Sequence, residues 1–595
     1  MLRLKFLLLA VLGLLVACGT PATPSVTTSA PTSAPTVAAT SAPPSAATAA
    51  PTTAATTAPT AAPTAPAATF KGDKLAAPDC NYGSADNPGE FKSIEATDAN
   101  TVVMTLCHPD PAFPDKVAFI AFGISSKDFL TKNGGDTQKL SEKPNGTGPY
   151  MLQEWVRGDH ITFAANPNFW GPAPKAKTVI LRWSKEAAQR LLELQSGTAD
   201  GIDNVAPEDI PTVQKDANLK IYPRDPLTTV YVAMNNKIKP FDNEKVRQAV
   251  AMAIDRKRIT DQFYAPGSVV AEQFAPPGIK PGNSEGMKWY AYDPAAAKKM
   301  LADAGFPNGF DVTLSYRDVV RPYLPSPGKV AQDIQAQLKD VGINVKLQVK
   351  ESGAFLDSAR QGNEPFFLLG WFADFPDATN FFDTHFSLAI KQWGNAYSDI
   401  ANEISAGATL SDPAERQKHY DKVNELLKQH APMVPLAYGT SAVAFKANVK
   451  GAHSSAFGDE SFYVMDNGSS KLVFMQNAEP ITLWCGDEED GETFRACIQM
   501  YDPLLNYEIG GTKVIPAIAE TYEGNKDATV WTFHLRKGVK FADGTTLNAN
   551  DVVASYAQQW DVNNPLHKGR QNLWTYFGSL FGACLNGKDG DCAKK

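Results

Sequence analysis

Apolar and polar residues follow two spacings along the chain, and the spacing predicts where helices and strands lie. Between residues 246 and 254 apolar side chains recur every three or four positions, which predicts an amphipathic helix with Asp242 as its cap. A second helix is predicted from Asp293 and Pro294 to Gly305, because a capping Asp, a first-turn Pro and a terminal Gly stand in that order.

The same patterns predict an α/β fold. Residues 310–314 alternate as a strand, residues 330–341 follow helical spacing, and residues 343–349 alternate again. A longer helix is predicted from Asp412 to the residues before Pro432, and a strand follows it. This order of strand, helix and strand is typical of an α/β lobe.

The first residues carry the pattern of a secretory signal with a lipoprotein cleavage site. Arg3 and Lys5 precede an apolar run from Phe6 to Val16, which is too short to span a membrane and stops just before Cys18. Residues 1–18 are therefore predicted to be a lipoprotein signal peptide, and Cys18 the site of lipidation. The expected location is extracytoplasmic, in the periplasm or at the cell surface, with a lipid anchor in the cell membrane.

A linker is predicted at residues 19–69, where Ala, Pro, Thr, Ser and Val make up everything after Gly19. Such a segment buries no core, and its dense proline favours extended polyproline II. About 50 residues at roughly 3.1 Å each would span up to ~150 Å between membrane and folded part.

Residues 70–595 have globular composition and are too many for a single hydrophobic core, so two or three lobes are expected. The net charge of −8 and a pI near 5.6 argue against a nucleic-acid partner. No further run is long and apolar enough to cross a membrane.

Six cysteines follow Cys18, an even number in an oxidising compartment, which favours three disulfides. Short separation pairs Cys485 with Cys497 and Cys584 with Cys592, which leaves Cys80 with Cys107. Six cysteines allow 15 connectivities, so this pairing is one choice among several. No CxxC pair occurs, and no metal site or other cofactor is expected.

Several short motifs together resemble one family. They are Gly146–Tyr150 with Glu154–Trp155, Asn166–Gly171, Leu194–Gly197 with Asp200–Ile202, Asn235–Asn236 with Pro240–Asn243, Val246–Ala249 with Ala253–Arg256, Gly370–Asp377, and Phe533–Phe541 with Asp543–Thr545. The chain resembles the extracellular solute-binding proteins of family 5, which serve ABC importers of peptides, nickel and related solutes. The resemblance implies a periplasmic-binding-protein-like clamp of type II with an additional lobe. It also implies a monomeric, non-enzymatic lipoprotein that captures di- or oligopeptides and delivers them to the membrane permease subunits.

The order of the motifs departs from that family. The strand predicted from Leu472 and the Phe533 motif resemble segments that normally open the mature protein, whereas here they close it. A circular permutation explains this order, with Asn467–Ser470 joining the old ends. A misassembled reading frame or fused gene fragments would explain it too.

The resemblance also implies a division into lobes. Lobe I would comprise residues 146–265 and 432–512, including the joining linker at 467–470. Lobe II would comprise residues 70–145 and 513–595, and lobe III residues 266–431.

Asp374 is the residue that we expect to bind the ligand. A zwitterionic peptide needs a buried acid, and Asp374 matches the motif position whose carboxylate pairs with the ligand α-amino group in peptide-binding members of the family. A turn role ahead of Pro376 is the alternative. Further candidates for the ligand-binding wall are Trp371, Phe372, Phe375, Asn380, Trp393, Tyr397 and Asn235. Asn380, Trp393 and Tyr397 are the weaker ones, because aromatic residues clustered in sequence belong more often to a core than to a site, and a turn before Pro240 explains Asn235 at least as well.

Other functions stay open. The acidic run Asp487–Asp490 is interpreted as a solvated loop under a disulfide. A secreted surface hydrolase is a rival, although the sequence has neither a Gly-x-Ser-x-Gly nor a His-Glu-x-x-His motif. An adhesive surface protein is a second rival, which the absence of internal repeats disfavours. Within the binding class, nickel complexes, heme, oligosaccharides and opines are alternatives to peptides.

Overall fold

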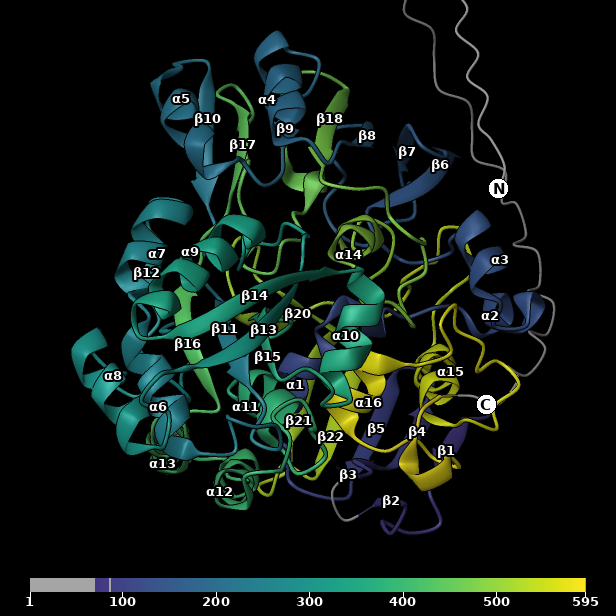
Figure 1. Cartoon of the computed structure of the whole chain (residues 1–595). Coiled ribbons are helices and arrows are strands. Elements are labelled where there is room, and N and C mark those ends of the chain that lie inside the picture. The colour runs from purple at the N-terminus through teal and green to yellow at the C-terminus, as the bar shows by residue number, and fades with distance from the viewer. Residues whose placement is uncertain (1–69, 85–86, 594–595) are drawn as a thin grey trace, which may run out of the picture. The chain divides into compact units, whose positions relative to one another are not determined.

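Three main β-sheets organise the part of the chain that the structure describes, residues 70–84 and 87–593 of a computed structural model (Figure 1). The signal peptide, Cys18 and the proline-rich linker lie outside these residues.

The strands of the three sheets are as follows. A five-stranded sheet has the order β1 (Lys74–Ala76), β4 (Phe91–Asp98), β5 (Thr101–Leu106), β22 (Val530–Leu535), β21 (Ala519–Gly524). A seven-stranded sheet has the order β10 (Leu219–Pro223), β17 (Ala442–Lys446), β9 (Gly201–Ile202), β18 (Lys471–Gln476), β8 (Thr178–Trp183), β7 (His160–Ala165), β6 (Tyr150–Val156). A six-stranded sheet has the order β12 (Val269–Val270), β16 (Met433–Tyr438), β11 (Thr228–Met234), β15 (Phe366–Phe372), β13 (Phe310–Arg317), β14 (Ile343–Lys350).

Two bodies follow from the way the sheets and cores group. We define body A as residues 70–223 and 442–593, which hold the five- and seven-stranded sheets, and body B as residues 228–438, which hold the six-stranded sheet. Buried apolar side chains from both sheets of body A, such as Phe91 and Phe163, share one cluster. Those of the six-stranded sheet, such as Val232 and Leu314, form another.

The remaining elements divide between the two bodies. Body A contains α1 (Phe113–Val117), η1 (Ile120–Phe122), α2 (Lys127–Asn133), α3 (Thr137–Glu142), α4 (Ala187–Ser196), η2 (Pro207–Asp209), α5 (Ile210–Lys215), η3 (Phe462–Val464), α14 (Gly491–Cys497), α15 (Ala549–Trp560), α16 (Thr575–Phe581) and η4 (Lys588–Gly590). Body B contains α6 (Glu244–Ala253), α7 (Arg256–Phe263), α8 (Pro294–Asp303), α9 (Pro327–Asp340), α10 (Ser352–Arg360), α11 (Thr379–Phe386), α12 (Ser398–Ala408) and α13 (Pro413–His430). Two small sheets, β2 (Gly83–Ser84) with β3 (Asn87–Pro88) and β19 (Leu505–Tyr507) with β20 (Val514–Pro516), complete body A.

The helices and strands predicted in body B are confirmed, with one correction at a helix start. β13, α9 and β14 follow one another as expected, and β13 pairs with β14 in parallel. Asp293 caps α8 by accepting a hydrogen bond from the Ala296 amide at 2.8 Å. The cap of α6 is Asn243 and not Asp242, because the Asn243 side chain is the one that accepts from the Lys245 amide.

A hinge of two chain segments connects the bodies. Within the described residues the chain passes from body A to body B at residues 224–227 and returns at residues 439–441. The two segments are hydrogen-bonded, since the Arg224 amide donates to the Ser441 carbonyl at 2.8 Å and the Thr228 hydroxyl to the Gly439 carbonyl at 2.8 Å. Two short adjacent segments of this kind are the usual means by which two domains close around a ligand.

The last part of the chain completes the two sheets of body A. β18 lies between β8 and β9 and pairs with both in parallel, and β22 pairs with β5. In Figure 1 the green β18 accordingly lies among the blue strands at the top, and the yellow β22 beside the purple β5. Residues 471–593 are therefore integral to body A, as a rearranged segment order requires. The permutation itself stays a prediction.

The sheets group differently from the expected lobes at two places. β11 lies within residues 146–265 and β16 within residues 432–512, the ranges assigned to lobe I, yet both strands belong to the six-stranded sheet of body B. The chain thus passes between the bodies at the two hinge segments. The first crossing lies about 40 residues before the expected boundary at 265, and the second a few residues after the expected boundary at 432.

The three predicted disulfides are confirmed. Cys80 bonds to Cys107, Cys485 to Cys497 and Cys584 to Cys592, so all three lie in body A.

Candidate functional site

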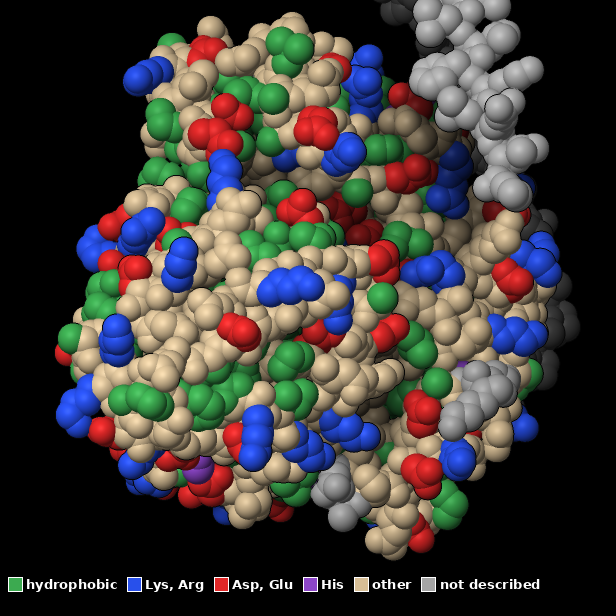
Figure 2. Space-filling view, in the orientation of Figure 1, with side chains coloured by type: hydrophobic (Ala, Val, Ile, Leu, Met, Phe, Trp, Pro, Cys, Tyr) green, Lys and Arg blue, Asp and Glu red, His purple; other side chains and the backbone are tan. Residues whose placement is uncertain are grey.

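A cavity of about 650 Å³ lies between the two bodies, within the range of roughly 300–1,000 Å³ that is usual for small-molecule sites. On the face shown in Figure 2 the molecule is hollowed, and acidic side chains lie at the bottom of the hollow. The polar and aromatic residues of the wall come from both bodies and the hinge. They include Asp203, Arg224, Asp459, Glu488, Glu489, Asp490, Glu492, Arg495 and Tyr576, and, from body B, Tyr231, Arg317, Arg321, Tyr323, Arg360, Trp371, Phe372, Asp374, His385, Lys391 and Gln392.

Asp374 lies in this wall, directly after β15. Its side chain is buried, with 8% of the residue exposed, and one carboxylate oxygen accepts from the Asn380 amide at 3.1 Å. The other oxygen accepts from the Tyr576 hydroxyl at 2.7 Å. Burial raises the pKa of Asp374 to about 7, because the charged form loses hydration that its hydrogen bonds only partly replace.

Asn380 holds the acid and an aromatic neighbour in place. Its side-chain oxygen accepts from the Asp374 amide at 3.0 Å and from the Trp371 ring nitrogen at 3.1 Å. Asn380 is fully buried in α11 and does not itself line the cavity.

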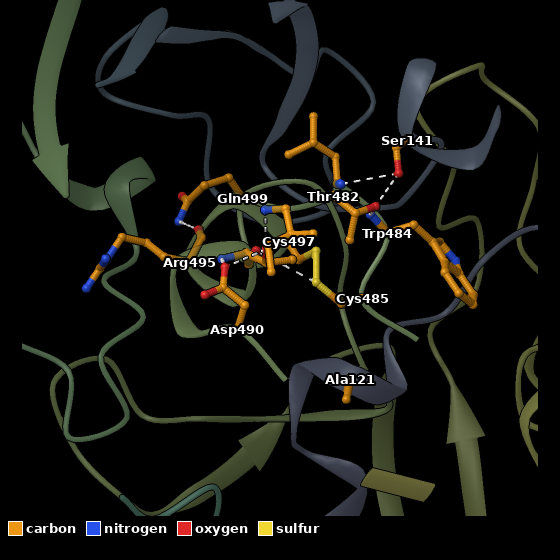
Figure 3. Close-up of a disulfide and its surroundings, with 12 residues drawn as sticks. Ala121, Ser141, Thr482, Trp484, Cys485, Asp490, Arg495, Cys497 and Gln499 are labelled. Carbon is orange, nitrogen blue, oxygen red and sulfur yellow. Dashed lines mark hydrogen bonds between the residues drawn. A yellow bond between two sulfur atoms is a disulfide. The ribbon is translucent and has the colours of Figure 1, made fainter. Parts of the chain in front are cut away.

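The acidic run before α14 is built into body A. The disulfide Cys485–Cys497 joins this segment to the last residue of α14 (Figure 3). Asp487 accepts from the backbone amides of Gln571, Asn572 and Trp574 at 2.7–2.8 Å, and the Asp490 side chain caps α14. The prediction of a solvated loop was wrong for Asp487 and Glu488, of which 4% and 3% are exposed.

Two contacts cross the cavity between the bodies. The Tyr576 hydroxyl of α16 reaches Asp374, and Arg360 of α10 pairs with Glu489 at 2.9 Å. The bodies are therefore in direct contact at the cavity wall in this structure.

Two arginines of body B line the cavity without a carboxylate within 4.0 Å among the described residues, Arg317 and Arg321. Burial opposes the charge of Arg321, but the nearby Glu492 carboxylate raises the pKa of its guanidinium above the usual range. Arg317 donates to two neutral hydroxyls, those of Ser352 at 2.9 Å and Tyr323 at 2.8 Å.

A buried ring of four charges supports the hinge side of the cavity. Arg224 contacts Asp203 at 2.8 Å and Glu460 at 2.6 Å, and Arg495 contacts the same two acids at 2.9 Å each. Each of the four side chains is at most 3% exposed. Buried ions need this complete pairing, because a missing partner leaves a charge without hydration.

Three of the eight predicted ligand-binding residues line the cavity: Asp374, Trp371 and Phe372. Phe375 is buried in the core cluster of body A, although it belongs to body B. Trp393 is buried in the core of body B, and Asn235 is fully buried where its amide donates to the Gly362 carbonyl.

Tyr397, the last of the eight, precedes α12 and packs its ring 5.0 Å from His430, away from the cavity wall. The ligand-binding role of all eight residues stays a prediction.

Sequence reasoning missed Tyr576, Arg317, Arg321 and Arg360 as wall residues. Tyr576 lies 202 positions from Asp374 in the chain, and no local pattern connects the two. Cavity-lining arginines on a strand end or loop look like surface charges in the sequence.

Metal and membrane features are absent from the described part of the chain. Residues 70–84 and 87–593 contain no cluster of three or more His, Cys, Asp or Glu side chains suited to a metal ion. Nor does any helix in these ranges have the length and apolar character needed to cross a membrane.

The protein consists of two bodies that a pair of adjacent segments connects, and both bodies line the cavity between them. This arrangement defines the class of hinged ligand-binding proteins. The model of the bacterial extracellular solute-binding proteins, family 5 (middle) matches residues 48–393 and 513–573, more than half of the chain. The chain belongs to this family, and its fold is that of the type II periplasmic binding proteins.

Relatives and solved structures agree with this assignment. The dipeptide-binding protein of Escherichia coli (strain K12) is 29% identical over 371 residues, which cover 61% of this chain and 69% of that protein. Heme-binding protein A of Haemophilus influenzae is 29% identical over 386 residues, 63% of this chain and 70% of that protein. The structure of the periplasmic binding protein DppA from Helicobacter pylori in complex with the peptide STSA superposes with a TM-score of 0.55 at 29% identity, covering 64% of this chain and 74% of that one.

Proposed function

We propose that the chain is the substrate-binding lipoprotein of an ABC importer and that it takes up peptides with free termini between its two bodies. The observation that carries the proposal is the pairing of charges in one cavity: the buried acid Asp374 and the arginine Arg321 line the same wall. A zwitterionic peptide offers an ammonium for the first and a carboxylate for the second kind of group.

Asp374 is suited to bind an ammonium group. Among the described residues no cation lies within 4.0 Å of its carboxylate, and its two partners there are the Asn380 amide and the Tyr576 hydroxyl. The raised pKa of Asp374, about 7, is the cost of burying that charge alone. A ligand ammonium would supply the missing positive charge, and closure of the bodies would exclude the water that weakens such a pair.

Arg321 is suited to bind the carboxylate of the same ligand. Its charge faces Glu492 and Asp490 of body A across the cavity at more than 4.0 Å, too far for a direct ion pair. A ligand carboxylate can approach the guanidinium directly and form two parallel hydrogen bonds. Asp374 and Arg321 both belong to body B, so the ligand would first dock on body B and be covered by body A.

The compartment and the partners of the proposed function extend beyond the described residues. The family is extracellular, and the sequence around Cys18 supports a lipid anchor that keeps the protein at the membrane. Delivery to permease subunits of an ABC importer is the step that would follow capture. The dipeptide-binding relative and the peptide complex support peptides as the ligand class.

The experiment that tests the proposal is native mass spectrometry of the protein purified without refolding, followed by calorimetry with dialanine. A released peptide and micromolar or tighter binding of dialanine support it. Release of heme, a nickel complex, an oligosaccharide or an opine instead would reassign the ligand, and hydrolysis of the added peptide would reassign the protein to the hydrolases.

A further inference from the structure

Arg317 is a cation of the cavity wall that the proposed function leaves unused. It stands at the end of β13 and lines the cavity, and its two terminal nitrogens donate to the hydroxyls of Ser352 and Tyr323. A guanidinium has five N–H donors and keeps its charge at any physiological pH. In the described part of the chain no carboxylate lies within 4.0 Å of Arg317 to compensate its positive charge. Its strong N–H donors therefore have no carboxylate acceptor there either.

Tyr231 supplies a second unused donor in the same corner. It lies on β11, is fully buried and lines the cavity. Its hydroxyl makes no hydrogen bond of normal geometry with the residues that the structure describes, although the Gln392 amide is nearby. A buried hydroxyl without a partner destabilises the empty cavity, and a ligand acceptor would recover that loss.

The two donors belong to one corner because both neighbour Tyr323. The Tyr323 hydroxyl accepts from Arg317, and Tyr323 and Arg317 both influence the ionisation of Tyr231. His385 packs against Tyr231 with ring centroids 6.2 Å apart and adds no charge, since burial lowers its pKa to about 3. Arg317 is therefore a charged group whose field acts on Tyr231 in this corner.

Arg317 differs from Arg321 in its charged surroundings. Arg321 faces Glu492 and Asp490 of body A across the cavity, whereas the hydrogen-bond partners of Arg317 are the hydroxyls of Ser352 and Tyr323. This corner of the cavity offers two unused donors and one unpaired cation. It therefore fits a ligand group that is negatively charged and only accepts hydrogen bonds.

We propose that Arg317 and the Tyr231 hydroxyl form a second anion-binding subsite, which selects peptides that carry an acidic side chain in addition to their two free termini. The inference rests on the proposed function, since it names the side chain that the same cavity prefers. The side-chain carboxylate of the peptide pairs with Arg317 and accepts a hydrogen bond from the Tyr231 hydroxyl, while Asp374 and Arg321 bind the two termini.

Calorimetry with matched peptides on the full-length protein tests the subsite. The probes are Ala-Ala as a neutral reference, and the pairs Ala-Glu with Ala-Gln and Glu-Ala with Gln-Ala, which have nearly the same shape. A hydrogen bond to a charged group contributes about 1.5–3 kcal/mol, so in at least one pair the Glu peptide is expected to bind ~10-fold or more tighter than the Gln peptide.

Three variants assign the preference to its residues. Arg317→Met is expected to bring the Glu/Gln ratio close to one while Ala-Ala affinity is kept, which also shows that the variant is folded. Tyr231→Phe is expected to lower the ratio several-fold without lowering the melting temperature, because the hydroxyl has no partner to lose. Lys391→Met, which removes another cation from the cavity wall, is the control and is expected to keep the ratio.

The outcomes separate the two proposals. Binding of Ala-Ala with a Glu/Gln ratio near one in the unmodified protein overturns the subsite and leaves the proposed function standing. An equal loss of the ratio in Lys391→Met and Arg317→Met also overturns it, because the preference then comes from the general field of the cavity. If none of the peptides binds, the proposed function fails and the subsite fails with it.

Discussion

The affinity for peptides is expected to depend on pH through Asp374. The pKa of this residue is about 7 in the unliganded cavity because burial disfavours its charge, and an ammonium ligand binds to the charged form. Lowering the pH protonates Asp374 and makes the proton a competitor of the ligand. The charged form of Asp374 predominates above pH 7, so the affinity falls as the pH drops through about 7.

The magnitude follows from the ionised fraction of Asp374. With a pKa of about 7, roughly nine in ten molecules carry the charge at pH 8 and about one in a hundred at pH 5. The terminal carboxyl of the peptide stays charged over this range, but its α-amino group titrates near pH 8 and is only about half charged at pH 8. The dissociation constant of a dipeptide is then expected to rise by about 40-fold between pH 8 and pH 5, or about 2.2 kcal/mol.

Calorimetric titration of dialanine at pH 8, 7, 6 and 5 measures this dependence, with Asp374→Asn as the matched control. The variant has nearly the same shape but no charge, and it is expected to bind about 100-fold more weakly or worse at pH 8. It keeps the other buried acids, among them Asp383 and Asp490, whose pKa burial also raises to about 7, so its pH dependence reports every titrating group except Asp374.

Two results would refute the reasoning. A dissociation constant that stays constant from pH 8 to pH 5 would show that Asp374 is not neutralised by the ligand. The same pH dependence in Asp374→Asn would show that other groups cause it.

Three further predictions concern the ring, the chain order and the anchor. Arg224→Met leaves Asp203 and Glu460 short of a partner and is expected to cost about 3–5 kcal/mol in the free energy of unfolding, measured in urea; a loss below 1 kcal/mol would contradict the paired-ring description. A relinked chain that places residues 471–593 before residues 70–466 is expected to fold and to melt within a few degrees of the original; a chain that stays unfolded would argue against a permuted order. Cys18→Ala is expected to release the protein from membranes into the soluble fraction, and persistent membrane association would exclude Cys18 as the anchor.

Local elements were predictable from the sequence because their signals are local. α8 begins at a capping Asp and a first-turn Pro, and β13 and β14 alternate over eight residues each, so spacing alone located them. The pairing of six cysteines was predictable because each pair is close in the chain.

The division into bodies was harder to predict, because strand pairing joins segments far apart in the chain. β11 and β16 are separated by about 200 residues, and only their hydrogen bonds show that they belong to the same sheet. Their hydrophobic patterns fit a buried strand in either body.

The cavity wall divides in the same way. Asp374, Trp371 and Phe372 belong to one motif, and the sequence placed them together. The groups that face them come from elsewhere: Tyr576 reaches Asp374 from α16, and Glu489 reaches Arg360 from the segment before α14. Asn235 and Trp393, both predicted to bind the ligand, are instead fully or almost fully buried, since a polar or aromatic side chain serves a core as readily as a wall.

The position of β18 has a consequence for biosynthesis. A ribosome delivers the strands in chain order, so β6, β7 and β8 emerge first and β9, β10 and β17 later, yet neither group bonds to the other until residues 471–476 arrive. Until then the inner strands β8 and β9 each keep an unpaired edge, the kind of surface that recruits foreign strands. The seven-stranded sheet is therefore completed only when the last part of the chain, from residue 471 onward, has been made. A nascent chain stalled before residue 471 is expected to be the most aggregation-prone species that the protein forms.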